Sequence, residues 1–457
     1  METSKLKREL STRQLTMISL GSAIGTGLFL GSGLAIQTAG PSVLVSYAVG
    51  AFIVLLLMGC LAEMTVAHPT SGSFGTIAER YVHPLAGFLV RYSYWVANVL
   101  AIGVEVSAIA IYMRYWFPDV NGFVWVALFG GLLIYINARH VHTFGTTEYW
   151  LSFIKVSAIF LFIILGTATL FGQPGSPIES ITTGDEGFFA FGFYGMWVTI
   201  FISLFSFLGT ELVAVTAGEA KDPDRAVPKA LRATVFRLTF FYLVTIAIML
   251  MLIPWQQAGI DQSPFVLVMQ QFDVPGAAGI LNFVILIAAL SAMNAQLYAS
   301  TRMMYSLAEA GDAPRVFKKV SQNGIPTYAL FVSTGGIVLA ALLQIFMETS
   351  YPFLMGISMF GAIFTWFMVF VSHLFFRKKW TGRKLPVRMI GYPVLPLLGA
   401  VLLLSLMITT WFTDFDILLK FGIPWLVGLT IVYFVRERFR KSDDQSDDQS
   451  DDIEQAN

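Results

Sequence analysis

Long apolar stretches follow one another through almost all of this 457-residue chain, separated by short polar connections. A helix needs about 20 predominantly apolar residues to cross the hydrocarbon core of a bilayer. In that core the backbone finds no hydrogen-bond partner outside its own helix, so the stretches are expected to be helical. Only 13% of the residues are charged, whereas about a quarter is usual for a soluble domain. The sequence therefore predicts an all-α, polytopic membrane protein.

Twelve stretches have the required length. The predicted spans are 15–35, 41–67, 86–112, 122–138, 149–171, 192–217, 233–254, 277–303, 327–347, 353–376, 391–412 and 417–435. Of the 29 Lys and Arg residues, 26 lie before the first span, after the last one, or in and beside every second connection between spans. Because cytoplasmic connections are enriched in these residues, both termini are predicted to be cytoplasmic. The ends are then a polar tail over 1–14 and an acidic, disordered tail over 436–457.

Several classes of function fit the composition poorly. The formal net charge is zero and Cys60 is the single cysteine, which argues against a nucleic-acid partner, a disulfide framework and a thiolate metal site. The chain has no phosphate-binding loop and no His-Glu-x-x-His motif. We therefore expect no enzyme, no cofactor and no metal site. Energy for concentrating a solute has to come from an ion gradient or a partner chain.

The first span contains a glycine-rich segment at its centre, residues 21–27 with the sequence GSAIGTG. Three glycines with interleaved hydroxyl groups favour local unwinding of a helix. Non-helical backbone at membrane depth is tolerated where it lines a cavity, and its free amides and carbonyls then bind a small zwitterion. The alternative is close helix packing, because Gly21 with Gly25 and Gly27 with Gly31 fit the small-xxx-small pattern.

The sixth span has a matching interruption at residues 205–211, FSFLGTE. The two interrupted spans are five helices apart, so two five-helix repeats would have opposite orientations in the membrane. Paired breaks of this kind indicate a binding site near the middle of the bilayer. Amides at a helix start suit a carboxylate, and unwound carbonyls suit an ammonium. An amino acid carries both groups.

Ionisable side chains inside spans are costly and mark ion or proton pathways. Lys155 in span 5 is a candidate for gaining and losing a proton, with snorkelling to the cytoplasmic surface as the alternative. Glu211 follows the second break and is a candidate relay or an anchor for the unwound segment. Glu105 in span 3 is either a relay or a protonated carboxyl tied to a neighbouring helix. Glu63, at the end of span 2, is expected to be structural.

Together these features resemble the bacterial amino acid permeases, the amino acid transporter family of the amino acid–polyamine–organocation superfamily. The likeness rests on segments 21–27 and 205–220, on Glu63 followed by the motif at 69–73, and on Lys155, and it extends from about Leu10 to Tyr433. It implies a 5+5 inverted repeat over 15–376 with broken helices 1 and 6, and helices 11 and 12 over 391–435 outside the repeat. It also implies proton-coupled secondary uptake.

The resemblance places the substrate on the two broken helices. The implied substrate-binding residues are Ala23, Ile24, Gly25, Thr26, Gly27, Phe205, Ser206, Leu208 and Gly209. In this arrangement the amides of residues 25–27 hold the carboxylate, the carbonyls of residues 23, 205 and 208 hold the amino group, and Phe205 is an aromatic gate. The candidates for proton coupling are Lys155, Glu211, Glu105 and Ser291, with the Lys155 ammonium expected near span 1 carbonyls and Ser291.

We therefore expect a proton symporter of the bacterial cytoplasmic membrane that imports amino acids, with small neutral L-amino acids such as alanine, serine or threonine as substrates. Its expected partners are the amino acid, protons and the lipid bilayer, with no obligate protein partner. The alternatives are an amino acid exchanger, a permease for aromatic, cationic or γ-amino acids, and a membrane amino acid sensor.

Overall fold

A computed structural model describes residues 11–70, 72–139, 144–172, 187–271, 275–321, 325–347 and 350–455, and in these ranges the regular structure is helical. The α-helices are α1 (Thr12–Ala23), α2 (Thr26–Phe29), α3 (Gly31–Ala39), α4 (Val43–Ala67), α5 (Ser73–Tyr81), α6 (Pro84–Arg114), α7 (Gly122–Arg139), α8 (Phe144–Gly172), α10 (Gly192–Ser206), α11 (Leu212–Val215), α12 (Pro223–Leu252), α13 (Pro264–Gln270), α14 (Ala277–Glu309), α15 (Thr327–Ser333), α16 (Gly335–Phe346), α17 (Tyr351–Lys379), α18 (Val394–Thr409) and α19 (Ile417–Gln455). The short 3-10 helices are η1 (Gly40–Ser42), η2 (Thr216–Glu219), η3 (Trp255–Gln257), η4 (Arg315–Lys318) and η5 (Thr410–Phe412).

Length and hydropathy identify the helices that can cross a membrane. Within the described residues, nine continuous helical runs are long and apolar enough, and shorter apolar helices lie at Leu15–Phe29, Gly122–Asn137 and Gly192–Ser206. These three correspond to the predicted spans 1, 4 and 6, of which spans 1 and 6 carry the interruptions. The prediction of an all-helical, polytopic membrane protein is confirmed.

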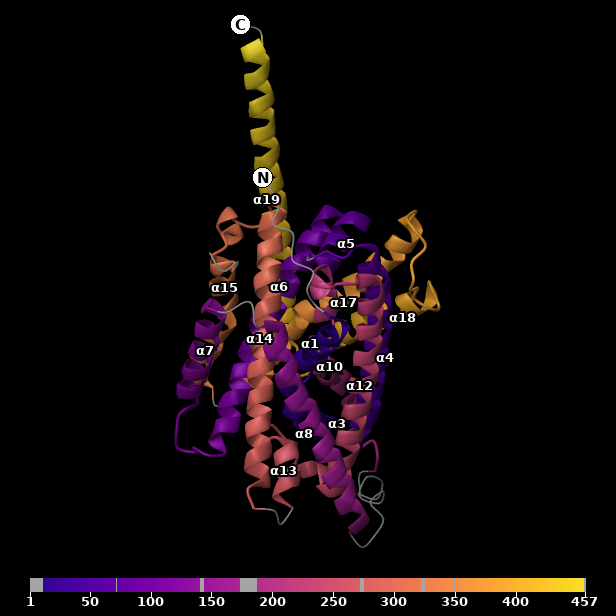
Figure 1. Cartoon of the computed structure of the whole chain (residues 1–457), viewed down its shortest axis with the longest axis vertical. Coiled ribbons are helices and arrows are strands. Elements are labelled where there is room, and N and C mark those ends of the chain that lie inside the picture. The colour runs from indigo at the N-terminus through magenta and orange to yellow at the C-terminus, as the bar shows by residue number, and fades with distance from the viewer. Residues whose placement is uncertain are drawn as a thin grey trace.

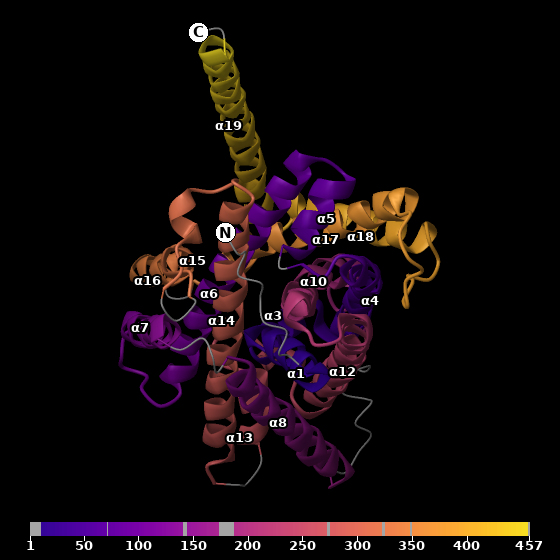
Figure 2. The same cartoon turned by 45° about the horizontal axis from the view of Figure 1, so that its top comes forward.

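The broken helices lie in the interior of the bundle. Helix α1 packs against α8, α12 and α14, and in two views it lies at the centre with longer helices around it (Figures 1 and 2). Helix α6, which packs between α14 and α17, is buried along its whole apolar window. Small residues permit this close packing, because a Cβ on Gly361 of α17 would overlap the Ser93 carbonyl oxygen of α6. Polar groups on α1 and α6 are thereby kept away from lipid.

Some elements differ from the predictions. Helix α12 begins at Pro223, well before the predicted start of span 7 at 233, because Pro223 is placed at a first-turn position that needs no N–H donor. A short helix that the apolar stretches do not predict, α5, begins at Ser73 in the connection after α4. Helix α19 continues through Gln455 and extends out of the bundle (Figure 1), where the sequence predicted a disordered tail. No Gly or Pro follows in this tail to end the helix once it is formed.

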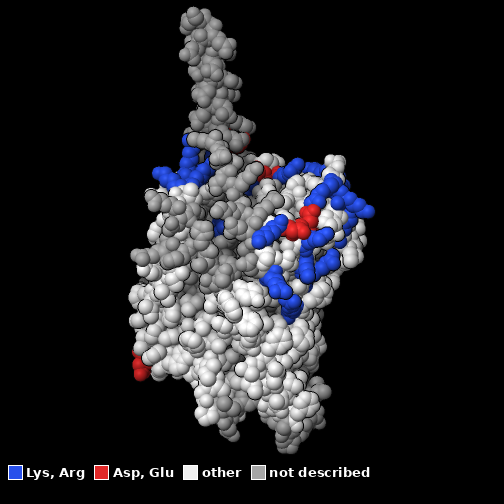
Figure 3. Space-filling model, in the orientation of Figure 1, with Lys and Arg blue, Asp and Glu red and all other residues white. Residues whose placement is uncertain are grey.

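Positive charge is unevenly distributed over the surface. On the face shown in Figure 3, Lys and Arg side chains gather toward the end of the molecule from which α19 extends. Large apolar side chains are exposed along several long helices, among them Phe160 on α8, Phe240 on α12 and Ile431 on α19. Such a surface is suited to contact with lipid. The single cysteine, Cys60, is fully buried on α4.

Candidate functional site

The first break separates α1 from α2. Helix α1 ends at Ala23 and α2 begins at Thr26, so that Ile24 and Gly25 lie between the two helices. Gly25 has an extended backbone conformation, which a helix cannot contain. The break falls inside the glycine-rich segment, and it frees carbonyl groups of the last turn of α1 for contacts with other parts of the chain.

Lys155 contacts these free carbonyls. Its ammonium donates hydrogen bonds to the carbonyl oxygens of Gly21, at 2.5 Å, and Ile24, at 3.1 Å. The side chain is fully buried on α8, so the alternative of snorkelling to the surface does not apply. A glycine is needed at position 21, because a Cβ there would overlap the Ser152 side chain of α8. The sequence thus allows α8 to approach α1 closely enough for Lys155 to reach the break.

Glu148 joins this group and was missed by the sequence analysis. Its Oε1 atom lies 3.9 Å from the Lys155 ammonium and accepts a 2.5 Å hydrogen bond from the Ser291 hydroxyl. Ser291 and Lys155 therefore contact the same carboxylate oxygen of Glu148, and the coupling role of Ser291 stays a prediction. Glu148 fell just outside the apolar stretch at 149–171. Glu148 and Lys155 are seven residues apart, which places them on one face of the helix. This spacing is the sequence signal that could have identified Glu148.

Glu105 reaches the other side of the first break from α6. Its carboxylate accepts a hydrogen bond from the backbone N–H of Thr26, at 3.2 Å to Oε2 and 3.4 Å to Oε1. A Cβ on Gly25 would lie 2.7 Å from Oε1 and 2.9 Å from the Ala292 side chain. A carboxylate of the protein thus accepts from the Thr26 amide, one of the three amides that the family resemblance assigns to the substrate carboxylate.

The second break separates α10 from α11. Helix α10 ends at Ser206, a turn follows, and α11 begins at Leu212. Gly209 in this turn has a φ of +99°, which L-residues with a side chain rarely adopt. Glu211 lies two residues on and accepts hydrogen bonds from the Gly209 N–H, at 3.1 Å, and from the Tyr94 hydroxyl, at 3.3 Å. Glu211 therefore contacts the unwound segment directly, and its roles as relay or anchor stay predictions.

Hydroxyl groups connect the two breaks directly. Ser22 donates to the carbonyl oxygen of Gly209 at 2.8 Å. Tyr242 of α12 donates to the carbonyl oxygens of Ala23, at 3.1 Å, and Ser206, at 2.6 Å. The Tyr47 hydroxyl lies 2.9 Å from the Ser206 hydroxyl. The two tyrosines were not predicted, because a tyrosine in an apolar span gives no sequence signal of its contacts.

Aromatic rings cover the site. Phe205 packs edge-on against Tyr351 with the ring centroids 6.4 Å apart, and Tyr351 donates a 3.3 Å hydrogen bond to the Thr26 carbonyl oxygen. Gly27 lies beside them, where a Cβ would approach the Ser206 backbone to 2.7 Å. Leu208 is buried in the turn of the second break. The structure thus brings the predicted residues of spans 1 and 6 together, with Lys155 and Glu105 contacting the first break from either side.

Glu63 lies in a separate cluster. Its carboxylate contacts the imidazole of His373 at 2.9 Å, the guanidinium of Arg377 at 2.8 Å and the backbone N–H of Met389 at 2.8 Å. These contacts connect α4 with α17 and with the segment that leads to α18. This arrangement agrees with a structural role for Glu63.

A bundle of apolar helices that buries two adjacent, unwound helix segments with ionisable side chains is the architecture of a multi-pass membrane transporter. Comparison with known proteins identifies the kind of transporter. A family model described as amino acid permease matches residues 14–445. The chain belongs to the amino acid permease family. It is therefore a transporter of amino acids and not an enzyme.

Several curated relatives match over nearly their whole length. The amino-acid permease RocE of Bacillus subtilis is 39% identical over 445 residues, 94% of this chain and 95% of RocE. The gamma-aminobutyric acid permease of B. subtilis is 39% identical over 451 residues, 97% of this chain and 96% of that protein. The lysine-specific permease LysP of Lactococcus lactis is 36% identical over 450 residues, 94% of this chain and 87% of LysP. The names of these relatives differ in substrate, so the likeness gives the class of solute and not its identity.

Proposed function

We propose that this protein imports amino acids by proton symport with alternating access, and that its substrates are small neutral L-amino acids of the alanine, serine and threonine type. The observation that carries the proposal is the position of the Lys155 ammonium on the carbonyls of Gly21 and Ile24 at the first break. A fixed cation at this position repels a sodium ion. The ion that remains for coupling is the proton.

The proposed substrate site lies between the two breaks. The amides of Gly25, Thr26 and Gly27 would hold the substrate carboxylate, and the carbonyls of Ala23, Phe205 and Leu208 its amino group. Support comes from the hydrogen bonds that join the breaks through Ser22 and Tyr242, because they keep these groups close together. Small side chains at the breaks suit a short substrate, and the Phe205 ring would shield it from water.

Proton coupling is assigned to the ionisable groups on the same breaks, Lys155, Glu105 and Glu211, with Ser291 acting through Glu148. A group that gains or loses a proton and also contacts the unwound backbone couples the two events, because the proton and the substrate then act on the same segment. Lys155 and Glu105 contact the first break from two different helices. A proton gained or lost by either group would change the contacts of the residues that are proposed to bind substrate.

The fold proposed for this mechanism has twelve spans. The core, 15–376, would be a 5+5 inverted repeat with broken helices 1 and 6, and helices 11 and 12, 391–435, would lie outside it. The paired positions of the two breaks support this repeat. The gathering of Lys and Arg at one end of the molecule supports cytoplasmic termini in a bacterial cytoplasmic membrane (Figure 3).

A cationic amino acid is the second candidate substrate, and Glu105 is the observation that favours it. Its buried carboxylate lies at the first break, where an ionised form would attract the distal cationic group of such a substrate. A relative that carries lysine in its name adds support. The side chain of a neutral substrate carries no charge that an ionised Glu105 would attract.

Uptake by the purified protein in proteoliposomes tests both candidates. An inward proton gradient is imposed, and a panel of twenty radiolabelled amino acids is tested with and without sodium and with an uncoupler. Accumulation of small neutral amino acids that the uncoupler abolishes and sodium does not affect is the expected result. Accumulation of lysine or arginine instead selects the second candidate.

Counterflow separates the remaining alternatives. Exchange without a pH gradient and without net accumulation would identify an exchanger. Binding seen by thermal stabilisation, with neither uptake nor exchange, would identify a sensor. Either result contradicts the proposed symport.

A further inference from the structure

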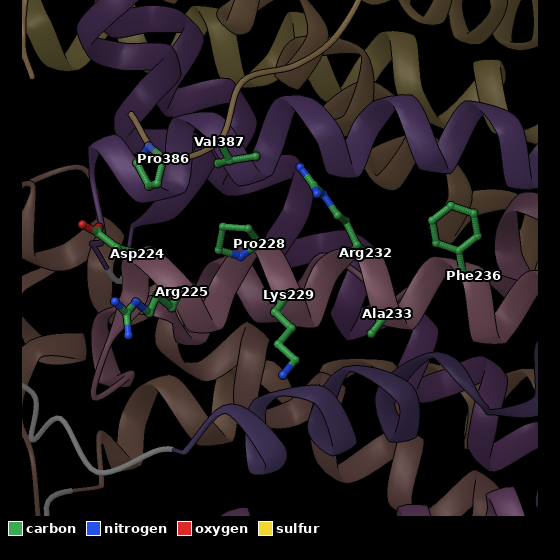
Figure 4. Close-up of a pocket in the computed structure, with 9 residues that line it drawn as sticks. All are labelled: Asp224, Arg225, Pro228, Lys229, Arg232, Ala233, Phe236, Pro386 and Val387. Atoms are coloured by element: carbon green, nitrogen blue, oxygen red, sulfur yellow. The ribbon is translucent and has the colours of Figure 1, made fainter. Parts of the chain in front are cut away.

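A groove lies on the outside of the bundle, away from the helix breaks. The first turns of α12 form one wall, and the segment between α17 and α18, at Pro386 and Val387, forms the other (Figure 4). Its volume is about 540 Å³. A space of this size accommodates a small polar group such as a phospholipid headgroup.

The α12 wall of the groove is basic. Arg225, Lys229 and Arg232 follow one another at spacings of four and three residues, which places them along one face of the helix. All three side chains are exposed. Figure 4 shows Arg232 extending toward Val387, whereas Lys229 extends away from it.

The acidic residue of the groove does not neutralise these cations. Asp224 accepts two hydrogen bonds from the Arg383 guanidinium, at 2.6 and 2.7 Å, so its charge is already balanced by a fourth cation. Arg225 approaches the exposed Asp222 only to 3.9 Å, a contact of little energy in water. The groove therefore keeps a positive charge that suits an anion.

The apolar surface that follows the basic residues selects the kind of anion. The same face of α12 continues from Arg232 to Phe236, which also lines the groove and is 63% exposed, and the nearby Phe240 is 54% exposed. Exposed aromatic rings on a membrane-spanning helix face lipid chains. A cationic turn followed directly by an apolar surface matches an anionic phospholipid, with its phosphate on the basic residues and its acyl chains along the rings.

We propose that this groove is a binding site for the headgroup of an anionic phospholipid, held by Arg225, Lys229 and Arg232. The site is independent of the proposed substrate site, since no residue is shared. A lipid bound here fastens the start of α12 to the segment before α18. Binding is expected to raise the thermal stability of the protein.

The test uses the full-length protein in detergent, with phosphatidylglycerol as the probe. The triple variant Arg225→Gln, Lys229→Gln, Arg232→Gln is compared with a matched variant, Arg315→Gln, Lys318→Gln, Lys319→Gln, which removes three exposed charges from η4 and the residue after it, outside the groove. Native mass spectrometry counts bound lipid, and a thermal shift measures stabilisation. The groove variant is expected to bind phosphatidylglycerol about ten-fold more weakly, because each basic residue near an anionic headgroup contributes to attraction.

Two outcomes overturn the proposal. Equal loss of bound lipid in both variants means that the removed charges act only through the overall attraction between the protein and anionic lipid, and not through this groove. Stabilisation of the wild type by inorganic phosphate without lipid, lost in the groove variant, identifies a soluble anion as the ligand. Phosphatidylcholine, which has no net charge, is the lipid control and is expected to bind both variants and the wild type alike.

Discussion

The two helix breaks look alike in sequence but are stabilised differently. Ionisable side chains from other helices contact the first break, Lys155 from α8 and Glu105 from α6. The second break is held by Glu211, which lies in the same unwound segment, and by hydroxyl groups of serine and tyrosine. A change of protonation on α6 or α8 therefore acts on the first break directly. Other helices contact the second break through hydroxyl groups, and the carboxylate that contacts it, Glu211, belongs to the break itself.

The largest effect is expected from Lys155→Met. This change removes the cation from the carbonyls of Gly21 and Ile24 and leaves the buried carboxylate of Glu148 without its partner at 3.9 Å. Loss of one member of a buried ion pair costs about 3–5 kcal/mol. Proton-driven accumulation is expected to fall at least about ten-fold, whereas substrate binding and exchange are better preserved.

The double variant Lys155→Met, Glu148→Gln controls for stability. It removes both charges and is expected to recover part of the lost free energy of unfolding without restoring accumulation. Measurements of thermal unfolding and of proteoliposome uptake separate the two effects. Unchanged uptake and unchanged pH dependence in Lys155→Met would remove the residue from the coupling mechanism.

Gly25→Leu is expected to abolish substrate binding. Already a Cβ at this position would lie 2.7 Å from the Glu105 carboxylate, and the longer side chain would fill the proposed carboxylate position. Overpacking of a buried site adds about 1–3 kcal/mol of destabilisation. The matched control is Gly131→Leu on α7, where a Cβ meets nothing within 4 Å. Wild-type affinity in Gly25→Leu, measured by substrate-dependent thermal shift, would mean that the glycines serve helix packing.

Glu105→Gln and Glu211→Gln compare the two breaks side by side. Both changes keep the shape of the side chain and remove its ability to ionise. Loss of a charge-assisted hydrogen bond costs about 1.5–3 kcal/mol of interaction free energy. This corresponds to roughly ten-fold or more in an equilibrium constant. We expect Glu105→Gln to flatten the pH dependence of uptake and Glu211→Gln to leave that dependence in place while lowering stability. Initial uptake rates over a pH series provide the measurement, and the reverse pattern would assign coupling to the second break.

The smallest effect is expected from Tyr242→Phe, which removes the hydroxyl that joins Ala23 to Ser206. Loss of a hydrogen bond of this kind costs about 1 kcal/mol. The expected result is a modest fall in melting temperature with substrate selectivity unchanged. Tyr328→Phe, on an exposed side chain of α15, is the control for the loss of a phenol. Equal melting temperatures of the two variants would show that the breaks do not depend on this bridge.

Apolar length predicts the helices of this chain well. The predicted span 86–112 corresponds to Pro84–Arg114, and the span 353–376 to Tyr351–Lys379. Short helices such as α5 and α13 escape this criterion, because they do not cross the membrane and carry no long apolar run. The glycine patterns predicted where unwinding occurs, since backbone freedom is a local property of the sequence.

The partners of the breaks were less accessible to sequence reasoning. Lys155 was identified because a cation inside a span is rare, but Glu148 lay one residue outside the apolar window. Tyr47 and Tyr242 contact the breaks through helix packing between segments far apart in the chain. A tyrosine in an apolar span is compatible with many environments, and only the packing of α4 and α12 decides which groups its hydroxyl meets.

The burial of Cys60 has a practical consequence for work on this transporter. A chain whose single thiol is enclosed in α4 already behaves as a cysteine-free background toward membrane-impermeant maleimides. Cysteines introduced one at a time into exposed connections will therefore report, by their labelling in intact and opened cells, which side of the membrane each connection faces. The sidedness of the termini and the number of crossings become measurable without replacing any native residue of the interior.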